Sequence, residues 1–203
     1  MKAVVIGSSG TIGKAVAQLL KDKGHEVVEA SRSTQPGVNI DDAATIDNFY
    51  ATLGQVDAII CAAGSAAFTT LDQLTDEQVR FSVNSKLSGQ INVVRKGLSN
   101  LSANGVFVIT GGFLAYSPTP QTAMISMVNA GLEGFAKAAA LGLTEGRRIV
   151  VVHPPWVAET AAKLGMDNPA QWPDAATTAT AYLEAIEGSI NGNPVFVKGY
   201  EPA

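Results

Sequence analysis

The stretch AVVIGSSGTIG, residues 3–13, decides the fold that we expect for this chain. Its first four residues form an apolar run typical of a buried strand, which Gly7 ends, and Gly13 opens a segment with helical spacing of apolar residues. Glycines in such a turn expose backbone amides at a helix start, where a pyrophosphate binds well. The turn therefore predicts a dinucleotide-binding site, although GxxGxxG spacing also occurs in turns that serve packing alone.

Apolar runs alternate with helical segments along the rest of the chain. This order predicts βαβ units and a Rossmann-type α/β fold, a doubly wound sheet of about seven mainly parallel strands with helices on both faces, in one domain spanning 1–203. The expected strands are 3–6, 26–30, 37–40, 57–61, 106–110, 148–153 and 194–198. The expected helices are 11–23, 42–53, 75–100, 121–143 and 175–187, with 159–173 as an irregular lid.

Composition limits the classes of function. Of the 203 residues, 46% are hydrophobic and 16% charged, and the formal net charge is -4 without a basic run, which argues against a nucleic-acid partner. The N-terminal apolar run is too short for a signal peptide or a membrane span, so we expect a cytoplasmic protein that does not bind membranes. The lone cysteine, Cys61, lies in an apolar run and is interpreted as core. We assign no metal ligands.

The end of the second expected strand favours one form of the cofactor. The segment Ser31-Arg32-Ser33 carries no acidic residue where NAD-binding sheets hold the ribose 2′-hydroxyl, and a guanidinium between two hydroxyls suits a 2′-phosphate. Glu29 is acidic, but strand alternation places its side chain on the other face from Ala30. We therefore predict NADP(H) as the cofactor. The small residues Ala62, Ala63 and Gly64 would let a flat ring or ribose pass close to the backbone.

These segments together resemble the short-chain dehydrogenase/reductase family over nearly the whole chain. The glycine turn looks like the family's own, and 62–64 is similar to its NAG segment. Asn39 and Ile40 lie where an Asp followed by an aliphatic residue usually meets the adenine. Asn84 matches the helix Asn of the catalytic tetrad, and 130–135 resembles the stretch after the active-site Lys. Pro154 and Val157 belong to a segment similar to the one after the sixth strand of the family.

The cofactor-binding residues expected from the pattern and the resemblance are Gly7, Ser9, Gly10, Thr11, Ile12, Gly13, Ser31, Arg32, Ser33, Asn39, Ile40, Ala62, Ala63, Gly64, Asn84, Asn129, Pro154 and Val157. The resemblance further implies a homodimer or homotetramer formed through the two long helices. Small residues on the 121–143 helix would allow another helix to approach closely.

The chain departs from the family at the residues that move protons. The family's Ser, Tyr and Lys positions hold Gly112, Ile125 and Asn129, and no Tyr in the chain is followed by a Lys four residues later. Tyr and Lys four apart on a helix share a face, where the Lys lowers the Tyr pKa. With the family's Ser, Tyr and Lys absent, Asn84 is the one residue of the tetrad that the chain retains. An Asn in a helix can also serve packing or a local hydrogen bond.

Tyr116 is the best substitute acid by position, because the loop after the fifth expected strand overhangs the nicotinamide end of such a site. Asn84 and Asn129 complete the candidate catalytic set, and Lys86, Ser126 and His153 are further candidates for which a structural role is the more common one. The residues expected to wall the substrate pocket are Phe113, Met124, Met127, Trp156 and Trp172.

Two functions remain open at this point. The chain is an NADP(H)-dependent oxidoreductase of atypical mechanism on a small apolar or aromatic substrate, or it is a catalytically inactive relative that binds NADP(H) as a sensor or structural protein. A non-redox enzyme that uses the same cleft is a third alternative. The sequence does not identify the substrate.

Overall fold

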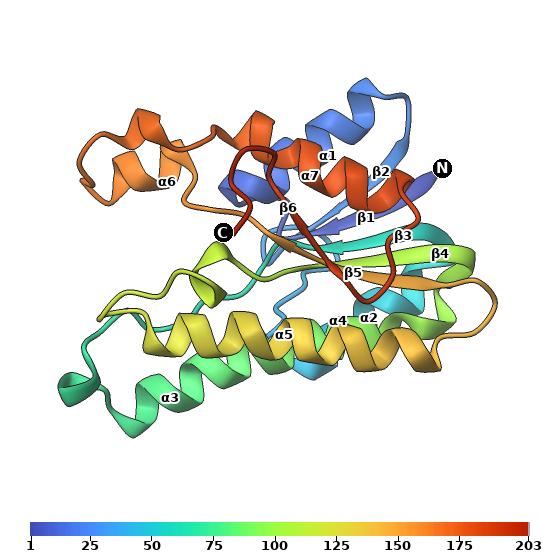
Figure 1. Cartoon of the computed structure of the whole chain (residues 1–203). Coiled ribbons are helices and arrows are strands. Elements are labelled where there is room, and N and C mark those ends of the chain that lie inside the picture. Colours follow the sequence, from blue (N-terminus) through green and yellow to red (C-terminus); the bar gives the residue numbers. More distant parts are fainter. Residues whose placement is uncertain (203) are drawn as a thin grey trace.

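A six-stranded parallel sheet forms the centre of the molecule (Figure 1). The computed structural model describes residues 1–202. The strands are β1 Lys2–Ile6, β2 Glu26–Ala30, β3 Val56–Cys61, β4 Leu101–Thr110, β5 Arg148–His153 and β6 Pro194–Phe196. Their order in the sheet is β2-β1-β3-β4-β5-β6, so the chain starts one strand from the edge, adds β2 on one side and then adds β3 to β6 on the other. The expected doubly wound Rossmann-type fold is confirmed.

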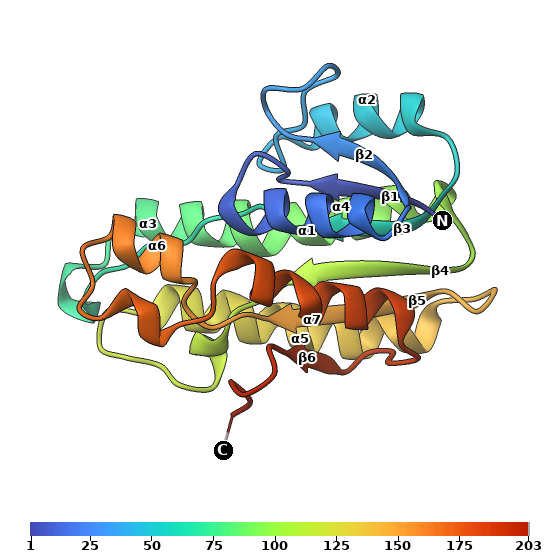
Figure 2. The ribbon, with the colours of Figure 1, turned by 90° about the horizontal axis from the view of Figure 1, so that it is seen from above.

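Helices cover both faces of the sheet (Figures 1 and 2). The helices are α1 Thr11–Asp22, α2 Ala43–Leu53, α3 Asp76–Ser82, α4 Gly89–Lys96, α5 Ala123–Gly142, α6 Ala158–Lys163 and α7 Ala175–Glu187. α1 and α7 lie side by side on one face, whereas α2, α4 and α5 lie on the other. Within residues 1–202 no helix has both the length and the apolar character needed to cross a bilayer.

The strands β1 to β5 supply side chains to two cores, which explains why their buried segments are apolar at nearly every position. In β1, Val4 and Ile6 pack toward α2, α4 and α5, whereas Ala3 and Val5 pack toward α1 and α7. A parallel sheet with both faces covered requires this pattern, because alternate residues point to opposite faces and neither face meets water.

The expected strand at 37–40 is not a strand, so the sheet has six strands rather than about seven. Val38 and Ile40 are buried, which accounts for the apolar pattern, but the segment has no strand partner. Its amides serve loop contacts instead, as when the Val38 N–H donates to the Ser31 carbonyl. The expected irregular lid at 159–173 is also partly wrong, because it contains most of α6 and the 3₁₀ turn η5 Pro169–Gln171.

The expected helix at 75–100 consists of α3, a π-helical turn η2 Val83–Ser88, α4 and the 3₁₀ turn η3 Gly97–Ser99. Its start is specified locally, because Thr75 and Gln78 form a reciprocal capping box. A π turn carries an extra residue relative to an α-helix and changes which side chains face the sheet after it. This change of register decides which residues of the helix reach the site.

Candidate functional site

A cavity of about 400 Å³ lies at the carboxyl ends of β1, β2 and β3. Parallel α/β sheets bind ligands at this edge, where the strand order reverses. The lining residues are Gly7, Ser9, Gly10, Ser31, Arg32, Val38, Asn39, Ile40, Asp41, Ala62, Ala63, Gly64, Ser65, Phe81 and Ser85. Ten of these were expected to bind the cofactor, and the structure brings them together although they come from four separate segments.

The glycine turn keeps the floor of this cavity free of side chains. Gly7 has φ +92, a backbone conformation that favours glycine, and a Cβ there would lie 2.8 Å from the carbonyl carbon of Ala62. A Cβ on Gly13 would lie 2.2 Å from the Gly7 carbonyl oxygen, so only glycine lets α1 begin this close to β1. Gly7, Ser9 and Gly10 line the cavity and no side chain caps the start of α1, so the turn fits the pyrophosphate of a dinucleotide.

Arg32 is exposed and lines the cavity, and it has no ion-pair partner among the residues that the structure describes. The hydroxyls of Ser31 and Ser33 hydrogen-bond each other at 3.0 Å beside it. Glu29 does not line the cavity and pairs with Lys21 of α1. The strand end thus presents a cation and hydroxyls to the cavity, as a 2′-phosphate requires.

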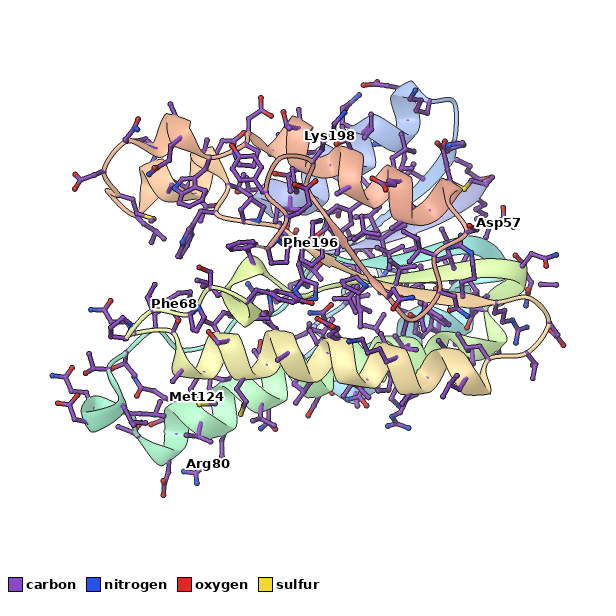
Figure 3. The ribbon with its side chains drawn as sticks, viewed as in Figure 1. Asp57, Phe68, Arg80, Met124, Phe196 and Lys198 are labelled. Carbon is purple, nitrogen blue, oxygen red and sulfur yellow. The ribbon has the colours of Figure 1, made fainter. Side chains whose placement is uncertain are left out.

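A second cavity of about 450 Å³ lies beyond the ends of β4 and β5. Its lining residues are Ile12, Phe68, Lys86, Thr110, Gly111, Gly112, Phe113, Leu114, Ser117, Thr119, Ile125, Pro154, Pro155, Trp156, Met166 and Trp172. Figure 3 shows Phe68 beyond the end of the sheet opposite to Asp57, and its ring centroid lies 5.7 Å from that of Trp156. The walls are mainly apolar and aromatic, so this cavity suits an apolar ligand.

The two cavities meet at η2. Ser85 lines the first cavity and the next residue, Lys86, lines the second. Gly64, at the exit of β3, has φ +117, and a Cβ on it would lie 2.9 Å from the Lys86 Cα. Glycine at position 64 is therefore needed for η2 to approach the strand ends.

Thr110 is held in place at the end of β4 by three elements. Gln90 of α4 is fully buried, accepts the Thr110 N–H at 2.7 Å and donates to the Thr110 carbonyl at 2.8 Å. The Thr110 hydroxyl donates to the Cys61 carbonyl at 2.7 Å and lies 2.8 Å from the Tyr182 hydroxyl of α7. The backbone at the floor of the apolar cavity is therefore fixed by side chains that the sequence patterns did not single out.

The residues that the resemblance assigns to the family's Ser, Tyr and Lys positions lie in or beside the apolar cavity. Gly112 and Ile125 line the apolar cavity, and Asn129 is buried beside them, where its amide donates to the Gly112 carbonyl at 3.3 Å. A Cβ on Gly112 would lie 2.6 Å from the Asn129 side-chain nitrogen. Asn129 therefore supports the loop after β4, and no group at these three positions exchanges a proton.

His153 is fully buried at the end of β5. Its Nδ1 lies 3.1 Å from the Gly112 nitrogen and 3.0 Å from the Gly112 carbonyl oxygen, so it accepts from the first or donates to the second according to the tautomer, and its Nε2 lies 3.5 Å from a Glu133 carboxylate oxygen. Burial lowers the His153 pKa, so the ring is neutral near pH 7. His153 thus supports the loop from behind the cavity.

Tyr116 is not where the sequence led us to expect it. It does not line the apolar cavity; its hydroxyl donates to Glu133, and its ring packs edge-on against His153 and Phe196. Burial, together with Glu133, raises its pKa. The 3₁₀ turn η4 Phe113–Ala115 explains the difference, because it directs Phe113 and Leu114 into the cavity and Tyr116 away from it.

Several other expected site residues also lie outside the two cavities. Asn84 is exposed on η2, and Ser126 and Met127 lie on α5 away from the cavity lining. Met124 lies at the start of α5 beside α3 (Figure 3). The residues of the expected cofactor set that line neither cavity are Thr11, Gly13, Ser33, Asn84, Asn129 and Val157. Phe113, Trp156 and Trp172 do line the apolar cavity as expected.

Cys61 is fully buried in β3, which confirms the interpretation as core. Burial raises the pKa of its thiol to about 12, so the thiol stays protonated and unreactive.

Sequence comparison relates the chain to known reductases. A family model described as enoyl-(acyl carrier protein) reductase matches residues 38–185. The chain is 25% identical to a 3-oxoacyl-[acyl-carrier-protein] reductase of Rattus norvegicus, over 75% of this chain and 74% of that protein. It is 26% identical to carbonyl reductase family member 4 of Danio rerio, over 97% of this chain and 96% of that protein.

Solved structures share the whole fold. The protein lin1944 from Listeria innocua is 37% identical, with a TM-score of 0.91 over 97% of this chain and 99% of that one. A small-chain dehydrogenase in complex with NADPH is 25% identical, with a TM-score of 0.86 over 98% of this chain and 97% of that one.

Proposed function

Because the chain belongs to the short-chain dehydrogenase/reductase family, we propose that it is an NADP(H)-dependent oxidoreductase that reduces a small apolar substrate without the family's Tyr and Lys. The observation that carries this proposal is the junction of the two cavities at η2, where a glycine-lined, Arg32-bearing cavity adjoins an apolar one. A solved relative of the same fold is a complex with NADPH. These features support a dinucleotide that extends from the first cavity to the edge of the second.

Residues of the first cavity bind the cofactor, and residues of the second cavity position the substrate. The glycine turn holds the pyrophosphate, Arg32 pairs with the 2′-phosphate, and Asn39 and Ile40 border the adenine end. NADPH supplies a hydride when it is bound. Phe113, Trp156 and the other apolar walls exclude water from the substrate, and fixed geometry alone accounts for a large part of a rate enhancement.

A second function, a catalytically inactive NADP(H)-binding sensor or structural protein, draws support from a specific observation. Gly112, Ile125 and Asn129 hold no proton-exchanging group at the positions where the family performs proton transfer. In that case the first cavity binds NADP(H) and the second accepts no reducible ligand.

The two functions are separated by mixing the protein with NADPH and a panel of carbonyls, imines, enones and quinones. We expect oxidation of NADPH, followed at 340 nm, with at least one apolar member of the panel. Tight NADPH binding without oxidation of the cofactor by any member would favour the sensor.

Replacement of Arg32 by alanine should weaken NADPH binding by roughly tenfold and leave NADH binding unchanged, because a charge-assisted hydrogen bond at an exposed site is worth about 1.5 kcal/mol. Titration calorimetry with both cofactors measures the effect. Arg95→Ala removes an equally exposed arginine from α4 and serves as the control. A 2′-phosphate preference that survives Arg32→Ala would overturn the role of Arg32.

Replacement of Tyr116 by phenylalanine should change turnover by less than about twofold, whereas loss of a proton donor costs 10²–10⁴. The reason is its position outside the apolar cavity. Steady-state kinetics on the substrate found in the panel measures the effect. A fall in turnover of tenfold or more in Tyr116→Phe would show that Tyr116 takes part in the reaction.

We also propose that the protein is a cytoplasmic homodimer or homotetramer. The outer surface formed by α3 and α5 supports association, because Val79 and Met127 are large apolar residues of these helices that stay 36% and 45% exposed. A glycine at position 134 of α5 leaves open space beside the same surface.

A further inference from the structure

Lys86 is the one charged residue that lines the apolar cavity. It belongs to η2, its side chain is 8% exposed, and its Nζ has no hydrogen-bond or ion-pair partner among residues 1–202. Lysine is rarely buried without a partner, because the ammonium loses its hydration. Lys86 therefore presents to the apolar cavity an amine that no described residue neutralises.

The groups around Lys86 do not neutralise it. Cys61 of β3 and His153 of β5 are the titratable groups that act on its charge, and both are themselves uncharged at neutral pH, since burial raises the Cys61 pKa and lowers the His153 pKa. Burial lowers the Lys86 pKa to about 8. The amine therefore exists in both protonation states near neutral pH, as a group that gives and regains a proton must.

The backbone is shaped to bring Lys86 to this place. Gly64 allows the Lys86 backbone to approach the exit of β3, where a Cβ would collide with it. Four residues after Lys86, Gln90 binds both backbone polar groups of Thr110, which also lines the apolar cavity. η2 and α4 are thus anchored to the cavity floor, which limits the movement of Lys86.

Other polar side chains of the cavity are less suited to give a proton. The Thr110 hydroxyl donates to the Cys61 carbonyl, so its proton is engaged in the sheet. Ser117 and Thr119 have hydroxyl groups whose ordinary pKa lies far above the physiological range. Tyr116 lies outside the cavity.

We propose that Lys86 is the proton donor for the reduction of an uncharged carbonyl compound with aromatic or alkyl substituents, an inference that rests on the proposed function. The carbonyl carbon accepts a hydride from the reduced nicotinamide, the π electron pair moves to the oxygen, and the oxygen takes a proton from Nζ. The products are an alcohol, the oxidised dinucleotide and a neutral amine, which regains a proton from water. The apolar walls and the single cation favour this substrate class over dicarboxylates or cationic compounds.

The test replaces Lys86 by methionine, which has a similar length and no proton to give. We expect kcat to fall by roughly 10²–10⁴ with NADPH affinity changed less than about threefold. In the wild type kcat should fall as the pH rises through about 8, because Lys86 loses its proton, and this alkaline limb should vanish in Lys86→Met. Lys23→Met, an exposed lysine just after α1, should behave like the wild type.

A second readout does not depend on turnover. The wild type and Lys86→Met are both labelled with ¹³C-lysine and their NMR spectra are compared. The Cε resonance that is present in the wild type and absent from Lys86→Met belongs to Lys86. We expect this resonance to titrate near pH 8. An ordinary lysine titration, near pH 10.4, would overturn the proposal. A Lys86→Met protein that keeps its kcat would also overturn the proposal. A rise in KM alone would overturn it too, because Lys86 would then bind the substrate and not donate a proton.

Failure of this inference and failure of the proposed function give different results. A wild type that binds NADPH and reduces no member of the panel overturns both. A wild type that reduces a carbonyl compound as fast as Lys86→Met overturns the role of Lys86 alone.

Discussion

Replacement of Gly13 by alanine should abolish measurable NADPH binding and lower the free energy of unfolding by about 2–4 kcal/mol. The new Cβ would lie 2.2 Å from the Gly7 carbonyl oxygen and 2.7 Å from its carbonyl carbon, so α1 must move away from the turn. That movement displaces the amides that hold the pyrophosphate. Urea denaturation and titration calorimetry measure the two effects.

The control for this variant is Gly134→Ala. Gly134 lies in α5 with nothing within 4 Å of the position of its Cβ, and alanine is the better helix former. We expect a gain in stability of up to about 1 kcal/mol and unchanged NADPH affinity. If Gly13→Ala bound NADPH as tightly as Gly134→Ala does, the turn would not be the pyrophosphate site.

Replacement of Gln90 by leucine should lower the free energy of unfolding by about 2–5 kcal/mol. The change removes two buried hydrogen bonds and leaves the Thr110 N–H and carbonyl without partners, each at a cost of about 1–3 kcal/mol. Because Thr110 lines the apolar cavity, turnover should also fall. Chemical denaturation measures the stability.

Gln18→Leu tests whether the effect is specific to the buried amide. Gln18 is exposed on α1 and hydrogen-bonds only Asp22, four residues later, so its loss should cost less than about 0.5 kcal/mol. Equal effects of the two substitutions would contradict the anchoring role of Gln90.

Features with a local cause were predictable from the sequence. Asp42 caps α2, and α7 begins and ends where the pattern of residues 175–187 indicates. The glycine turn and Arg32 also lie where expected, because each follows within two residues of the end of a strand that the sequence predicts. In such cases the residues near in sequence determine the structure.

Features set by contacts between distant elements were not predictable. Residues 37–40 have an apolar pattern typical of a strand, but pairing depends on a neighbour that the sheet does not provide. Tyr116 follows β4 as expected, yet a single 3₁₀ turn directs it toward Glu133. Asn84 was favoured over Lys86 because it resembles the helix Asn of the family's tetrad, and the π turn that contains both residues is not visible in helical periodicity. A signal did exist for Gln90, a polar residue at a position whose helix neighbours Val93 and Val94 are core.

The π turn also has an evolutionary consequence. An α-helix becomes a π turn by insertion of one residue, and deletion of residue 87 or 88 would restore regular winding and rotate everything before it by about 100° relative to Gln90. Such a deletion would move Lys86 out of the apolar cavity while α4 kept its packing. A single-residue insertion or deletion at this point would therefore change the residue presented to the substrate without redesign of the helix or of the sheet beneath it.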